Sequence, residues 1–145
     1  MAQLIEILLV EDNPGDVELT REALSHGKIT NTLRVVNDGE QALFYLRKQG
    51  EYANVTTPDI VLLDLNLPKL NGHQVLAEVK NDPLLKTIPI IVLSSSEEHS
   101  DIQETYKLSA NSFVTKPVEV DRFLSVVQHI EHFWIEIVKL PKFHE

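Results

Sequence analysis

Residues Asp59 to Pro68 read DIVLLDLNLP, a short apolar run that leads directly into the carboxylate Asp64. Such a run, bounded by polar and turn-forming residues, predicts a buried strand, because strands of parallel sheets lack polar alternation. Asp64 then lies at the carboxyl end of that strand. Ligands of open α/β sheets bind at this edge, so the carboxylate is placed for function.

Length and composition limit the kind of protein. A chain of 145 residues suits one domain that can bury a sizeable core. Thirteen Lys plus Arg against 22 Asp plus Glu give a net charge of −9, which argues against binding to nucleic acid. Cysteine is absent, and no run approaches the roughly 18 apolar residues of a membrane span. The acidic start MAQLIEILLVED does not resemble a signal peptide, so we expect a cytoplasmic protein without a membrane partner.

Apolar runs alternate with stretches of helical periodicity along the chain. The predicted strands are Ile5–Val10, Leu33–Val36, the apolar run within Asp59–Pro68 that leads to Asp64, Ile88–Leu93 and Ser112–Thr115. The predicted helices run from Pro14 to about His26, from Gly39 to about Gln49, over Asn71–Asn81, over Glu98–Leu108, and onward from Glu119. Residues 49–58 are predicted to be a polar loop.

Regular β-α alternation predicts a parallel sheet with right-handed crossovers and helices on both faces. Five β-α units fit a doubly wound, flavodoxin-like (βα)5 fold with the strand order 2-1-3-4-5. The switch point of this order lies between the first and third strands. The ends of these two strands therefore lie side by side.

Three carboxylates are expected to meet at that point. Glu11 and Asp12 follow the first strand, and Asp64 ends the third. Like charges this close repel strongly, and a hard divalent cation such as Mg²⁺ relieves the repulsion. Individually, Asp12 or Asn13 could instead cap the first helix, and Asp64 could cap its own loop.

Two further strand ends carry polar groups. Ser94, Ser95 and Ser96 end the fourth strand, and Lys116 with Pro117 ends the fifth. Taken alone these are ordinary loop and turn residues. Together with the acids they supply a metal site, a nucleophilic carboxylate, a cation and a hydroxyl, which are the parts needed to transfer a phosphoryl group to an aspartate.

The sequence resembles the receiver domain of two-component response regulators. The similarity covers nearly the whole chain and rests on ILLVEDN, DIVLLDLNLPKLNG, PIIVLSSSE and FVTKP, in that order. The resemblance implies that Asp64 accepts phosphate from a phosphohistidine of a sensor histidine kinase. It also implies that Asp12, Asp64 and the backbone carbonyl of Asn66 bind Mg²⁺, or alternatively Mn²⁺, with Glu11 in support.

Other roles follow from the same resemblance. Lys116 would contact the phosphoryl oxygens, Ser94 would be the hydroxyl switch, and Phe113 would be the aromatic switch that follows it. We further expect Asn66 and Ser96 to flank the path of the hydrolytic water and so to set the lifetime of the phosphate.

Within this family the chain is most similar to the small regulators that serve bacterial phytochrome kinases. The segments DLNLPKLNGHQVLAEVK, PLLKTIPIIVLSSSE and HFWIEIVKLP carry this similarity. It implies a phytochrome as the kinase partner, a receiver without an output domain, and pairing of two copies through the carboxyl-terminal segment.

The carboxyl-terminal segment also predicts an interface on physical grounds. A helix of about 20 residues from Glu119 is about 30 Å long, whereas a strand of five or six residues spans only about 17–20 Å. Its overhanging end would expose apolar surface, which is typical of an interface. We therefore expect a receiver domain over 1–132 and a dimerisation extension over 133–145; alternatively the tail folds back over its own domain. The interface residues we expect are Phe133, Trp134, Ile137, Val138 and Leu140.

Other functions were compared with the same residues. A phosphohydrolase of the haloacid dehalogenase type needs a second aspartate two residues after the nucleophile, where this chain has Asn66. A nucleotide-binding fold needs a glycine-rich phosphate loop after the first strand, where the chain reads EDNPGD. A pseudo-receiver that only binds proteins remains an alternative. The sequence thus favours a signalling phosphoacceptor that is not a turnover enzyme and that acts on a downstream protein target.

Overall fold

The computed structural model of the chain describes residues 4–25, 30–65, 67–94 and 112–115. Its elements are β1 (Leu4–Val10), α1 (Pro14–Ser25), β2 (Thr30–Val36), α2 (Gly39–Leu46), a 3₁₀ turn η1 (Gly50–Tyr52), β3 (Ile60–Asp64), α3 (Gly72–Lys80), β4 (Ile90–Ser94) and β5 (Ser112–Thr115). The segments for which the last two helices were predicted lie outside the described residues.

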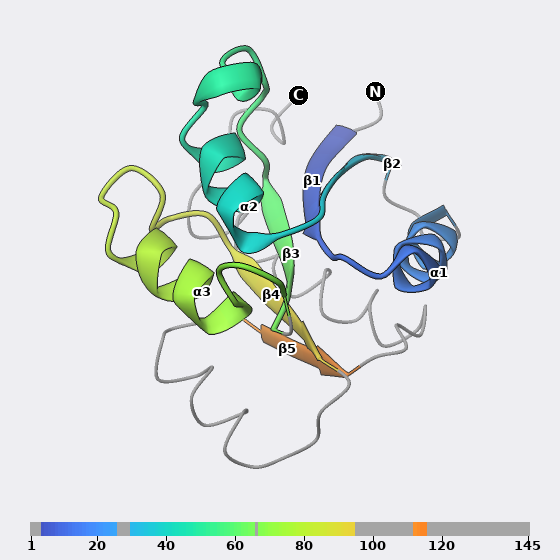
Figure 1. Cartoon of the computed structure of the whole chain (residues 1–145). Coiled ribbons are helices and arrows are strands. Elements are labelled where there is room, and N and C mark those ends of the chain that lie inside the picture. The colour runs from blue at the N-terminus through green and yellow to red at the C-terminus, as the bar shows by residue number, and fades with distance from the viewer. Residues whose placement is uncertain (1–3, 26–29, 66, 95–111, 116–145) are drawn as a thin grey trace.

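The strands form one parallel five-stranded sheet in the order β2-β1-β3-β4-β5, which confirms the predicted topology. Helices α2 and α3 cover one face of the sheet, and α1 covers the other (Figure 1). Within the described part of the chain, no helix combines the length and the apolar composition that a bilayer crossing requires.

The two faces of the sheet divide its apolar residues by strand periodicity. In β1, Leu8 and Val10 pack with α2 and α3, whereas Ile7 and Leu9 pack with α1. Because successive side chains of a strand point to opposite faces, a fully apolar strand can serve two cores at once. The uniformly buried β3 shows the same division, with Leu63 in the first cluster and Leu62 in the second.

Several element boundaries differ from the prediction. Strand β2 begins at Thr30, three residues earlier than expected, because its polar first half pairs with β1. Strand β4 begins at Ile90 rather than Ile88, after Pro89, which has no N–H to give to a ladder. Helix α2 ends at Leu46, and the loop predicted over 49–58 contains the 3₁₀ turn.

Candidate metal centre

The first acidic loop lies at the carboxyl end of β1. Glu11 is fully buried although it carries a carboxyl group. Its backbone N–H donates to the carbonyl of Val36 at 3.0 Å, and its carbonyl accepts from the side-chain amide of Asn37 at 3.3 Å. The end of β2 therefore fixes both backbone polar groups of Glu11.

The cap of α1 is formed by Asn13. Its side-chain oxygen accepts from the backbone N–H of Asp16 at 3.0 Å, and its own N–H donates to the Glu11 carboxylate at 3.3 Å. This resolves the alternative raised by the sequence, because the capping oxygen comes from Asn13. The neighbouring Asp12 is exposed at the mouth of the site.

The second acidic loop begins with Asp64, the last residue of β3, which is 2% exposed. The first residue of α3, Gly72, donates its N–H to the carbonyl of Leu65 at 3.0 Å. A Cβ at Gly72 would lie 2.5 Å from the carbonyl oxygen of Asp64, so only glycine allows the helix to begin this close. Helix α3 is thereby packed against the backbone that carries Asp64.

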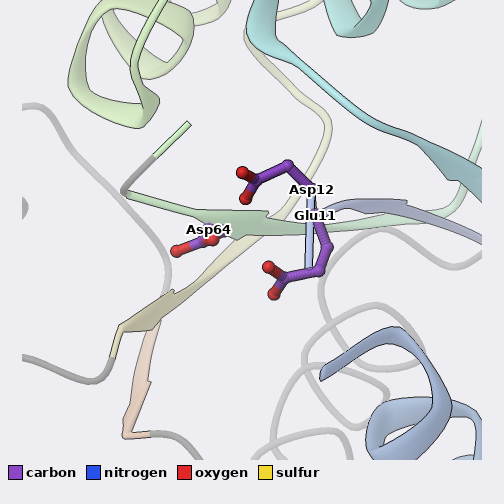
Figure 2. A group of neighbouring side chains, drawn as sticks. All are labelled: Glu11, Asp12 and Asp64. Carbon is purple, nitrogen blue, oxygen red and sulfur yellow. The ribbon is translucent and has the colours of Figure 1, made fainter. Parts of the chain in front are cut away.

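The three carboxylates meet as predicted. Each of Glu11, Asp12 and Asp64 offers an oxygen, and these oxygens lie within 4.8 Å of one another. Figure 2 shows the side chains leaving the ends of two adjacent strands. Two of the three carboxylates are buried, which strengthens their mutual repulsion.

This donor set fits a hard divalent cation. Mg²⁺ takes oxygen ligands at about 2.0–2.1 Å, so oxygens on opposite sides of one ion are about 4.2 Å apart. The oxygens of the three carboxylates are at most 4.8 Å apart, a limit only slightly longer than that span. An ion held here would neutralise charge on the acids and on a bound phosphoryl group.

The remaining predicted site residues are placed only in part. Ser94 ends β4 and pairs with Thr115 of β5, and Phe113 pairs with Val92, so these backbones lie on neighbouring strands. Their side chains lie outside the described residues. So do Asn66, Ser96, Lys116 and the predicted interface residues Phe133, Trp134, Ile137, Val138 and Leu140.

Sequence reasoning overlooked the loop between β2 and α2, which contacts both acidic loops. This loop and the first two residues of α2, together Asn37 to Glu40, carry no motif of catalytic chemistry. The strand order contained the available signal, because β2 lies beside β1 and its carboxyl end must reach the same edge of the sheet. Lys69, which reaches this loop from the segment after Asp64, was also missed.

Comparison with known proteins defines the family to which the chain belongs. The family model described as the response regulator receiver domain matches residues 7–128. The chain therefore belongs to the response regulator receiver family, as its resemblance implied.

Three relatives within this family are similar to the chain over most of its length. The chain is 44% identical over 135 residues to the response regulator Rcp1 of Synechocystis sp., covering 93% of this chain and 92% of that protein. It is similar to the phosphorylated cyanobacterial phytochrome response regulator RcpA, with 46% identity, a TM-score of 0.78, and coverage of 92% of this chain and 96% of the other. The Mn²⁺-bound form of Rcp1 has 43% identity, a TM-score of 0.76 and the same coverage.

Proposed function

We propose that this chain is the phosphoacceptor of a two-component phosphorelay and that Asp64 takes the phosphoryl group. The observation that carries the proposal is the position of the Asp64 carboxylate, which is buried at the end of β3 with oxygens of Glu11 and Asp12 within 4.8 Å. A lone buried carboxylate would be costly, whereas a carboxylate grouped with metal-binding oxygens is a nucleophile whose charge can be balanced.

The transfer itself needs little from the protein beyond position and charge. A carboxylate oxygen of Asp64 attacks the phosphorus of a phosphohistidine, a new O–P bond forms, and the P–N bond breaks with its electron pair left on the imidazole. Water later attacks the acyl phosphate and releases inorganic phosphate, which regenerates the carboxylate. The chain thus catalyses only its own phosphorylation and dephosphorylation, and it is not a turnover enzyme for other substrates.

The metal of the proposed reaction is Mg²⁺, with Mn²⁺ as a substitute. Asp12, Asp64 and the backbone carbonyl of Asn66 would hold it, with Glu11 in support, and the ion would supply positive charge to the phosphoryl oxygens. A relative at 43% identity is described as Mn²⁺-bound, which supports the choice of a divalent cation.

The same proposal assigns the response to phosphate. Lys116 and Ser94 contact the phosphoryl oxygens, and Phe113 follows Ser94 as the second switch residue. A phosphoryl group adds about −1.5 to −2 charges and strong acceptor oxygens, so it shifts the population of the loops after β4 and β5. Asn66 and Ser96 adjust the rate of hydrolysis.

We further propose the partners. The kinase is a phytochrome, because the relatives Rcp1 and RcpA are response regulators and RcpA is described as that of a phytochrome. Residues 1–132 form the receiver, and 133–145 pair two copies of the chain. The output is to a protein target in the cytoplasm rather than to nucleic acid.

The deciding experiment is the intact mass of the native chain and of Asp64→Asn after incubation with Mg²⁺ and acetyl phosphate. We expect one phosphoryl adduct in the native chain, no adduct in Asp64→Asn, and no adduct when EDTA replaces Mg²⁺. Asp59→Asn is the matched control, because Asp59 lies at the other end of β3, where its carboxylate accepts from the N–H of Glu6 at 2.9 Å. A native chain that never gains an adduct would favour the pseudo-receiver alternative.

A further inference from the structure

We propose that the segment Asn37–Glu40, which joins the end of β2 to the first two residues of α2, is a brace that positions both acidic loops of the metal centre. Lys69 is the positioning residue that fastens the loop after Asp64 to this brace. The inference rests on the proposed function, because it concerns the affinity of that centre for its divalent cation.

The first contact of the brace is with the Glu11 loop. The side-chain amide of Asn37 donates to the carbonyl of Glu11. The preceding residue, Val36, accepts from the N–H of Glu11 through its own carbonyl. The buried Glu11 carboxylate in turn accepts from the N–H of Asn13. The end of β2 therefore fixes the backbone from which the Glu11 side chain leaves, and Asn13 contacts its carboxylate.

The second contact is with the loop that follows Asp64. A Cβ at Gly39 would lie 1.9 Å from the carbonyl oxygen of Leu70, so the loop and the start of α2 touch backbone to backbone. This loop also returns to its own origin, since Gly72 donates to the carbonyl of Leu65. The loop after Asp64 is thus held at its two ends by the Gly72–Leu65 hydrogen bond and at Leu70 by the contact with Gly39.

The third contact is electrostatic and is made by Lys69. Its ammonium nitrogen lies 3.8 Å from a carboxylate oxygen of Asp38 and 3.8 Å from one of Glu40. The backbone of Lys69 has a φ of 64°, a conformation that costs a side-chain-bearing residue free energy. The Asp38 carboxylate is only 14% exposed and also caps α2 through the N–H of Gln41 at 2.8 Å, so Lys69 is tied to a fixed point.

Preorganisation is the physical reason for expecting an effect on the metal. A site binds an ion best when its ligands are already in place, and the loop after Asp64 carries the backbone carbonyl proposed as a ligand. Loss of the Lys69 contact leaves that loop held only through Leu65, Leu70 and Gly72, so it is less ordered and binding carries an added ordering cost. A simple charge effect predicts the reverse, because removing a cation near acidic groups favours another cation.

The test compares Mn²⁺ dissociation constants, measured by electron paramagnetic resonance of the free ion, for the native chain, four single variants and the double variant Lys69→Met/Glu40→Gln. Lys69→Met keeps the length and the backbone strain but removes the charge, and Glu40→Gln removes the opposite charge. Arg47→Met is the matched control, because Arg47 forms ion pairs with Glu78 at 3.1 Å and Asp82 at 3.5 Å, at the other end of α2. Lys69→Arg is the conservative replacement that restores the contact.

We expect Lys69→Met and Glu40→Gln each to weaken Mn²⁺ binding about two- to fivefold, the range that a partly exposed ion pair can supply. The double variant should be weaker than the native chain by less than the product of the two effects. Lys69→Arg keeps the positive charge, so it should bind Mn²⁺ more tightly than Lys69→Met and nearly as tightly as the native chain. Arg47→Met should lower the melting temperature without changing the Mn²⁺ affinity.

Two results would overturn the brace. Tighter binding in Lys69→Met together with weaker binding in Glu40→Gln would reduce the effect to long-range charge. Equal Mn²⁺ affinities for Lys69→Met, Arg47→Met and the native chain would show that the contact does not position the loop. A native chain that binds no Mn²⁺ and gains no phosphoryl adduct would instead refute the proposed function.

Discussion

Lys48 and Lys69 both adopt a positive φ, at 55° and 64°, in the described part of the chain. The two residues differ in what that conformation achieves. Lys69 places its ammonium group near two carboxylates beside the metal centre. Lys48 follows Arg47, the C-cap of α2, and its N–H donates to the carbonyl of Tyr45, while the next N–H, of Gln49, donates to the carbonyl of Phe44. This is a Schellman ending, in which glycine is the usual residue.

Lys48→Gly should therefore stabilise the protein by about 0.5–1 kcal/mol, because glycine pays no steric cost at positive φ. Part of the gain is offset by the greater freedom of glycine in the unfolded chain. Urea unfolding monitored by circular dichroism measures the change. Lys48→Ala is the control and should give no such gain, since alanine keeps the Cβ; an equal gain in both variants would contradict the argument.

At the scale of elements, α3 links local sequence to the site. Asn71 accepts from the N–H of Gln74, and the Gln74 side chain accepts from the N–H of Asn71, both at 2.9 Å. This reciprocal capping box fixes the first turn of the helix. Because Gly72 directly follows and packs against the backbone of Asp64, the cap also determines where the helix meets the end of β3.

Asn71→Ala should lower the free energy of unfolding by about 1 kcal/mol, the usual cost of losing an N-cap oxygen. Asn71→Ser keeps a capping oxygen and should lose much less. Both values come from the same chemical denaturation curves at constant Mg²⁺. A loss in the serine variant as large as in the alanine variant would show that the cap is not the cause.

At the scale of the whole molecule, the sheet gathers acids that the chain keeps far apart. The net charge is −9, and three of the carboxylates converge where β1 and β3 end. Their repulsion is a cost of folding that a bound cation removes. Stability and metal binding are therefore linked in this fold.

Mg²⁺ at ten times its dissociation constant should stabilise the native chain by about 1.4 kcal/mol, and EDTA should abolish the gain. Asp12→Asn should be more stable than the native chain in EDTA by about 1 kcal/mol, because it relieves repulsion at a functional site. It should also lose most of its response to Mg²⁺. Thermal unfolding with and without Mg²⁺ measures both effects, and an undiminished Mg²⁺ response in the variant would contradict the assigned ligand.

Much of this architecture was predictable because the decisive signals are local. The apolar run before Asp64 has the length and composition of a buried strand. The helix predicted over Asn71–Asn81 is α3, and these two residues are its N-cap and C-cap. The regular alternation of strands and helices allowed few topologies, and the strand order is the predicted one. The convergence of Glu11, Asp12 and Asp64 followed from that order.

The sequence by itself determined the sheet, its order and the acids at its edge, since these depend on hydrophobic periodicity and on which residues end each strand. Only the tertiary structure decided how the loops are held. The contacts of Asn37 with Glu11 and of Lys69 with Asp38 join residues distant in sequence. The positive φ of Lys69 could not be predicted either, because lysine has no preference for that conformation. Such contacts depend on backbones that meet only after the sheet has formed, and for that physical reason no local pattern predicts them.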